Sequence, residues 1–122
     1  MEWKPISKPE LQARIEQDFS RMMKPQQRLW KSIRIDPTKW QQHPYGDQGD
    51  GFWVIAVIGR TVIWYNDIED GFNRSNYSSM GTINEYFCNN YELELTIEYL
   101  LIAIESGHDI LQFVPKVQRP SP

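Results

Sequence analysis

Two apolar segments separated by two residues constrain the fold of this chain more than any other feature. Residues 52–58 (FWVIAVI) and 61–65 (TVIWY) flank Gly59-Arg60. Gly at the first central position of a two-residue loop is typical of a type II′ turn, whose twist matches that of paired antiparallel strands. The first segment is apolar on both faces, which predicts a central strand covered on both sides. The sequence therefore predicts an antiparallel sheet built around this hairpin.

A helix is expected near the N-terminus. Ser7 and Glu10 have the spacing of a capping box, and the apolar stripe that follows predicts a helix over residues 8–23. Pro25 is expected to end this helix, because proline lacks the N–H of an interior helical hydrogen bond. Residues 28–35 fit either a helix or a strand, and the Asp-Pro pair that follows them favours the strand.

The second half of the chain predicts one more strand and one more helix. Residues 66–79 are polar and rich in turn formers, which indicates a connection. Residues 81–88 alternate in polarity and predict a strand. Asn89-Asn90 is expected to cap an amphipathic helix that ends at residues 106–107.

These elements predict a single α+β domain over residues 1–122, in the order α-β-β-β-β-α. An antiparallel sheet of about four strands is expected, with an N-terminal and a C-terminal helix packed on it. The remaining segments are expected to form one helical turn at 36–39, a loop at 43–51, a docking segment or last strand at 110–114, and a frayed tail at 115–122.

The net charge of −3 conceals an uneven distribution along the chain. Residues 1–42 carry nine Lys/Arg against five Asp/Glu, whereas residues 43–109 carry two Lys/Arg against eleven Asp/Glu. Proteins that bind nucleic acid cluster Lys and Arg to displace phosphate counterions, and an acidic central segment argues against that class. We therefore expect no nucleic-acid partner.

Composition also argues against membrane, disulfide-rich and metal-binding classes. No apolar run approaches the ~20 residues that a membrane-spanning helix needs, and the N-terminus lacks the apolar region of a signal peptide. The single cysteine, Cys88, permits neither an internal disulfide nor a thiolate-rich metal site. The sequence thus predicts a cytoplasmic domain with no membrane association, no metal and no cofactor.

Two carboxylate-rich loops flank the predicted hairpin and are the candidate binding site. The second loop fails the EF-hand pattern, because counting from Asn66 places Ile68 at the third position and Tyr77 at the twelfth. A solvated turn is the alternative to a partner-facing acidic patch. The candidate binding residues are Asp47, Asp50, Asp67, Glu69, Asp70 and Phe72.

Two other functions are compatible with the sequence. His43 with Asp47 or Glu85 offers a base and an orienting carboxylate for a small hydrolase, although the absence of any motif around His43 favours an exposed or structural histidine. A homo-oligomeric structural protein that pairs through an edge strand is the other alternative, and the oligomeric state stays open.

The stretch from Trp53 to Asn90 carries the most distinctive motifs: a hairpin ending in Trp-Tyr-Asn-Asp-Ile-Glu, a Gly-Phe-Asn turn and Gly-x-Ile-x-Glu-Tyr-x-Cys-Asn. It resembles a group of small uncharacterised bacterial proteins that share these motifs. This resemblance covers about a third of the chain and assigns no catalytic residue. In size, acidity and α+β layout, the chain is also similar to immunity proteins that neutralise bacterial toxins.

The leading interpretation is a non-enzymatic protein-binding module, of the immunity type that inhibits a toxin. An acidic face would steer association with a basic partner such as a toxin, and aromatic anchors would supply affinity. Trp3 and Trp40 lie in irregular segments and are expected either to be such anchors or to pack against the helices.

Overall fold

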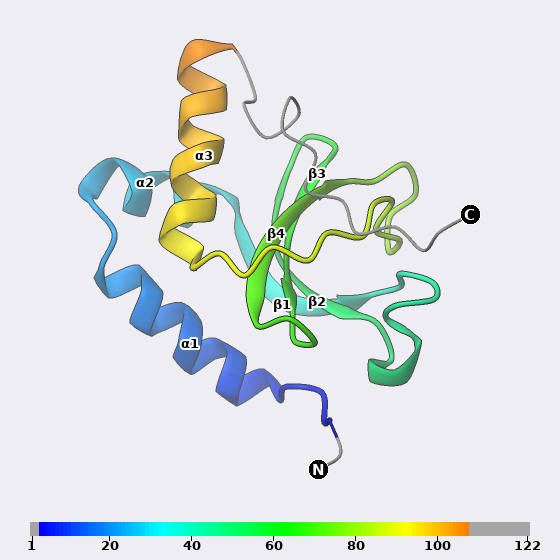
Figure 1. Cartoon of the computed structure of the whole chain (residues 1–122). Coiled ribbons are helices and arrows are strands. Elements are labelled where there is room, and N and C mark those ends of the chain that lie inside the picture. Colours follow the sequence, from blue (N-terminus) through cyan, green and yellow to red (C-terminus); the bar gives the residue numbers. More distant parts are fainter. Residues whose placement is uncertain (1–2, 108–122) are drawn as a thin grey trace.

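The fold is a curled four-stranded sheet with three helices on one of its faces (Figure 1). A computed structural model describes residues 3–107 of the chain. The strands are antiparallel and follow the order β1-β2-β3-β4. The elements are α1 (Lys8–Ser20), α2 (Lys24–Ile33), β1 (Arg34–Trp40), a 3-10 turn η1 (Asp47–Gly49), β2 (Phe52–Ile58), β3 (Thr61–Asn66), β4 (Gly71–Asn76) and α3 (Leu93–Ser106). The α+β class and the four-stranded antiparallel sheet are confirmed, but residues 3–107 contain three helices, because α2 follows α1 directly.

The hairpin is confirmed at its predicted position. Ile58 pairs with Thr61, and Gly59 takes a φ of 58° between the two strands, as the first residue of a type II′ turn requires. The register shifts between Val54 and Ala56, which leaves Ile55 as an extra residue in β2. Ile55 and Val54 both have 0% exposure and lie in different core clusters. The strand is therefore covered on both faces, as its sequence predicts.

Pro25 begins a helix instead of ending one. It lies in the first turn of α2, where its missing N–H costs no hydrogen bond. The Met23 N–H at the cap is satisfied by Gln26 Oε1 at 2.8 Å. The preference for a strand over residues 28–35 was wrong for residues 28–33, because Trp30 and Ile33 are both buried on one face of α2. The helical turn expected at 36–39 was also wrong, because these residues belong to β1.

The fourth strand was missed, and the strand expected at 81–88 was wrong. β4 has the polar sequence GFNRSN, yet most of it is buried. Its polar groups have specific partners: Asn73 exchanges hydrogen bonds with the backbone of Asn89, and Ser75 Oγ accepts from Trp64 Nε1 at 2.9 Å. Residues 81–88 instead form isolated bridges and cover the sheet face opposite the helices.

The core has two layers, one on each face of the sheet. Helix residues pack on one face, and the ring of Trp40 packs edge-on against Tyr77 on the other, with centroids 5.2 Å apart. Since Trp40 ends β1 and Tyr77 follows β4, the sheet is curled enough to bring these corners together. The second layer consists of Trp40, Phe52, Val54, Val62, Trp64, Ile83 and Tyr86. Of the two irregularly placed tryptophans, Trp40 is thus a core residue, with 5% exposure.

The N-terminus of α3 is capped from another part of the chain. Glu92 stands at the cap position but makes no side-chain capping bond, so the predicted cap at residues 89–90 was wrong. The N–H of Leu93 donates instead to Asp18 Oδ2 of α1, at 2.8 Å. Gly107 ends α3 with a φ of 77°, as predicted. Residues 110–114 and 115–122, for which a docking segment and a tail are predicted, lie outside the described residues.

Candidate functional site

The two acidic loops, which are distant in the sequence, meet at one end of the sheet. Residues 41–51 connect β1 to β2, and residues 67–70 connect β3 to β4. Both connections lie at the same end because the strands alternate in direction. Lys39 lies near both loops: its Nζ donates to the Gly49 carbonyl at 2.6 Å, and the charges of Asp67 and Asp50 partly oppose the lowering of its pKa by burial. We call this region, which carries Asp47, Asp50, Asp67, Glu69 and Asp70, the acidic end.

The N-terminal segment fastens the two loops together. Trp3 Nε1 donates to the Asp67 carbonyl at 2.9 Å, and the N–H of Ile6 donates to Asp67 Oδ2 at 2.8 Å. The indole of Trp3 also covers Gly49, where an added Cβ would lie 3.2 Å from the ring. Trp3 remains 37% exposed. It therefore lies across the seam between the loops and presents an aromatic surface there.

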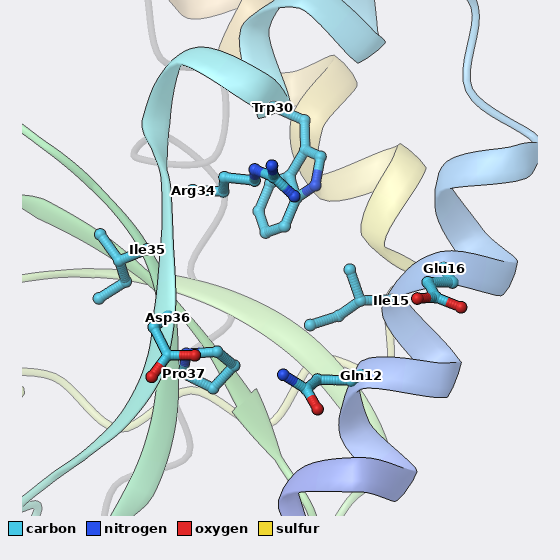
Figure 2. A pocket seen from close by; sticks show the side chains of 8 residues that line it. All are labelled: Gln12, Ile15, Glu16, Trp30, Arg34, Ile35, Asp36 and Pro37. Carbon is cyan, nitrogen blue, oxygen red and sulfur yellow. The ribbon is translucent and has the colours of Figure 1, made fainter.

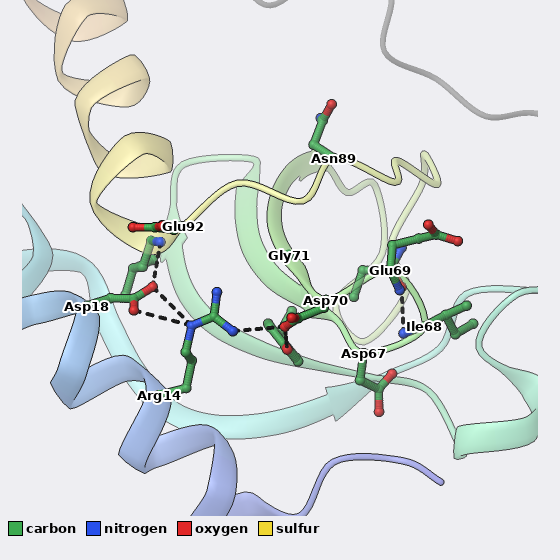
Figure 3. Close-up of polar contacts among 12 residues, drawn as sticks. Arg14, Asp18, Asp67, Ile68, Glu69, Asp70, Gly71, Asn89 and Glu92 are labelled. Atoms are coloured by element: carbon green, nitrogen blue, oxygen red, sulfur yellow. Dashed lines mark hydrogen bonds and ion pairs between the residues drawn. The ribbon is translucent and has the colours of Figure 1, made fainter. Parts of the chain in front are cut away.

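Asp67 and Asp70 both bind other parts of the chain, and Figure 3 shows Asp70 beside Arg14. Asp70 accepts from the Tyr65 hydroxyl and from Arg14 Nη1, and these two bonds lower the pKa of the Asp70 carboxyl. Burial raises the pKa of Asp67, against the opposing effect of its bond from the Ile6 N–H. Two of the five predicted acidic contacts are therefore committed to intramolecular partners.

Arg14 extends this network from the acidic end to the helices. Its guanidinium lies 2.8 Å from Asp70 and 3.2 Å from Asp18, whose side chain has 0% exposure. Arg21 binds the same Asp18 oxygen at 2.7 Å and Glu94 at 2.5 Å. The two arginines thus bind carboxylates of α1, α3 and the β3–β4 turn, and Asp70 is the acidic-end residue that they neutralise.

Asp50 and Glu69 are the acidic-end residues whose carboxylates bind no other described residue. Both are exposed, and their side chains form no hydrogen bond or ion pair within residues 3–107. Ile68, which directly precedes Glu69, is 43% exposed. Its side chain faces outward because Asn66 Oδ1 accepts from the N–H groups of Ile68 and Glu69 and fixes the turn. Phe72 has 0% exposure in the core, so its assignment as a contact residue was wrong.

The alternative hydrolase residues are only partly brought together. His43 Nδ1 contacts Asp47 Oδ1, with side chains 68% and 50% exposed. Glu85 does not join this pair, because its Oε1 accepts from the Asn76 N–H at 2.8 Å. A pair so exposed does not by itself exclude water or hold a substrate. The predicted contact of His43 with Asp47 is thus present without the surroundings of a catalytic site.

Trp3 is the site residue whose position the sequence did not reveal. Its hydrogen-bond partner, Asp67, lies 64 positions away, and no local motif connects the two. Arg14 was missed for the same reason, since its contact with Asp70 spans 56 positions. The one local signal was the clustering of carboxylates in the two loops, and it located the acidic end without identifying which carboxylates are free.

The described part of the chain adds two negative findings. Residues 3–107 contain no group of three or more His, Cys, Asp or Glu side chains arranged to hold a metal ion. Within the same range, none of the helices is both long and apolar enough to cross a membrane. Comparisons of the chain with known protein families, with curated proteins and with solved structures find no match.

Proposed function

We propose that the chain is a non-enzymatic protein-binding module that holds a basic partner at the acidic end, as an immunity protein holds a toxin. The observation that supports this is the juxtaposition of Asp50 and Glu69 with two exposed apolar side chains, Trp3 and Ile68. Asp47 lies in the same loop as Asp50 and adds a third exposed carboxylate.

Charge and apolar surface have different tasks in such an interface. Uncompensated carboxylates attract a basic partner over distances of about 8–10 Å at physiological salt and raise the association rate. A desolvated tryptophan contributes most to the lifetime of the complex, and its loss commonly costs about 2 kcal/mol or more. Trp3 already has its indole N–H satisfied by Asp67, so burying the ring against a partner leaves no unpaired donor.

A matched pair of charge reversals tests the proposal. Glu69→Lys and Glu105→Lys each replace one exposed glutamate and change the net charge equally, but Glu105 lies near the end of α3. We expect affinity capture with the tagged full chain to retain a basic protein with the wild type and with Glu105→Lys. Capture should fall with Glu69→Lys and be lost with the double variant Asp50→Lys/Glu69→Lys.

The design separates binding from folding. Circular dichroism and the thermal midpoint of each variant show whether it folds, and Asp67 and Asp70 are left intact because they stabilise the structure. Undiminished capture by a folded Asp50→Lys/Glu69→Lys variant would contradict the proposal. Equal losses with Glu69→Lys and Glu105→Lys would also contradict it, since the effect would then follow net charge and not the acidic end.

A further inference from the structure

Among the helices within residues 3–107, α3 is the one that leaves large apolar side chains exposed, namely Leu95 and Ile104. The groove between α1 and β1, by contrast, has a mostly polar lining that includes Glu16, Arg34 and Asp36 (Figure 2). The apolar helical surface that remains open to a further contact therefore lies on α3.

Ile104 continues the stripe through which α3 packs on the rest of the protein. Leu93, Ile97 and Leu100 are the buried residues of this stripe, and Ile104 follows them at the same helical spacing. Ile104 is nevertheless 50% exposed, and the last turns of α3 extend past α2 (Figure 1). Leu101, in the same turns, is half-buried. The core-facing stripe of α3 thus extends beyond the core that the described residues supply.

The C-cap of α3 turns the chain away from the helix axis beside this exposed stripe. Gly107 takes a φ of 77°, and its N–H donates to the Ala103 carbonyl at 2.9 Å. A left-handed residue at this position ends a helix with a change of direction, and an apolar side chain that follows it commonly contacts the last turns. Four of the next seven residues are apolar: Ile110, Leu111, Phe113 and Val114.

The segment that follows α3 is long enough to lie against Ile104. Seven residues span up to about 23 Å when extended. The three residues from Ile104 to Gly107 rise by only about 5 Å along the helix. An apolar side chain among residues 110–114 can therefore return to the last turns of α3 without any other element moving.

Charge favours this segment over a second copy of the chain as the occupant. α3 carries three glutamates and no basic residue. In a symmetric dimer the same face meets itself, so these glutamates would approach the glutamates of the second copy. Residues 108–119 instead carry Lys116 and Arg119 against one carboxylate, and opposite charges on neighbouring surfaces attract.

We propose that residues 110–114 cover the exposed end of the α3 stripe, with their apolar side chains packed on Leu101 and Ile104. The segment completes the helix-facing layer of the core at the place where the described residues leave it open. This contact is independent of the proposed function, because it involves neither the residues nor the partner of the acidic end.

Nuclear Overhauser effects in the full chain test the contact directly. In a sample with ¹³C-labelled methyl groups, we expect such effects between the Ile104 methyls and the side chains of residues 110–114. A mixed sample of labelled and unlabelled chains distinguishes contacts within one chain from contacts between two. Effects found only between chains would place a second copy on α3 and overturn the proposal. The absence of any effect from Leu101 or Ile104 to residues 110–114 would overturn it as well.

A double-mutant cycle measures what the contact contributes to stability. Ile104→Ala should lower the thermal midpoint of the otherwise unchanged chain by about 4–8 °C, because it removes a covered apolar side chain. The second background replaces the apolar residues of the segment: Ile110→Ser/Leu111→Ser/Phe113→Ser/Val114→Ser. There, Ile104→Ala should leave the midpoint unchanged or raise it slightly, because alanine has the higher helix propensity.

Leu95→Ala is the matched control, because Leu95 is an exposed apolar residue of α3 that does not belong to the stripe. It should have the same effect in both backgrounds. Equal effects of Ile104→Ala in the two backgrounds would overturn the proposal. None of these results bears on the acidic end, since capture of a basic partner is measured with variants of Asp50 and Glu69.

Discussion

Replacing Asp18 by alanine is expected to destabilise the fold by about 3 kcal/mol, a change that follows from the hydrogen bonds that three residues donate to one buried carboxylate. Asp18 has 0% exposure. Its Oδ1 accepts from Arg21 at 2.7 Å and from Arg14 at 3.2 Å, and its Oδ2 accepts from the Leu93 N–H at 2.8 Å. One side chain therefore joins α1 to the first turn of α3.

The magnitude comes from what each partner loses. The Leu93 N–H is buried, and leaving such a donor unsatisfied costs about 1–3 kcal/mol. The lost helix cap is included in that cost and is not added to it. On an exposed helix, the loss of a cap alone typically costs about 1 kcal/mol. The two arginines do not add the full cost of a buried unpaired charge, because their side chains are 24% and 42% exposed and keep Asp70 and Glu94 as partners.

Urea unfolding followed by tryptophan fluorescence measures the effect. With an m-value of about 1.5 kcal/mol/M, a loss of about 3 kcal/mol lowers the midpoint by about 2 M. Asp18→Asn keeps one acceptor for the Leu93 N–H and should fall between the wild type and Asp18→Ala. Glu16→Ala, an exposed substitution on the same helix, should change stability by no more than about 0.5 kcal/mol. A midpoint for Asp18→Ala within the range of Glu16→Ala would refute the reasoning.

Three further predictions follow from close packing and from pKa shifts. Gly71→Ala should lower the free energy of unfolding by at least about 2 kcal/mol, because an added Cβ would lie 2.2 Å from the Asn89 carbonyl oxygen; a urea midpoint like that of the wild type would contradict this. The bond from Tyr65 lowers the folded-state pKa of Asp70, so its carboxylate stabilises the fold above the ordinary aspartate pKa of about 3.9 and loses this effect as the pH falls. The free energy of unfolding of Asp70→Asn should therefore fall less than that of the wild type between pH 7 and pH 3. An equal fall in the two proteins would argue against a lowered pKa of Asp70. Burial raises the pKa of the Cys88 thiol, so Ellman's reagent at pH 7.5 should react several-fold faster in urea than with the folded chain, and equal rates would disprove it.

Local patterns predicted the parts of the fold that local contacts determine. The prediction of the hairpin was correct because its turn residues and its paired strands are adjacent in the sequence. The capping box of Ser7 and Glu10 is present for the same reason. The acidic loops were also visible, since clustered carboxylates next to strand ends need no knowledge of the rest of the chain.

Elements that depend on distant partners were not predictable in this way. β4 is a buried strand because Asn73 bonds the backbone of Asn89, and a polar hexapeptide gives no sign of that partner. The cap of α3 comes from Asp18, which lies 75 positions from Leu93. The division of the acidic residues into structural and free ones likewise depends on the remote contacts of Trp3 and Arg14.

The central claim is that partner binding takes place at the acidic end, and hydrogen–deuterium exchange tests it most directly. The exchange of the full chain is compared with and without the captured partner. We expect slowed exchange in residues 47–50 and 66–70 and in the segment that follows Trp3, with the exposed face of α3 unchanged. Slowed exchange confined to α3 or to the groove between α1 and β1, with the acidic end unchanged, would contradict the claim.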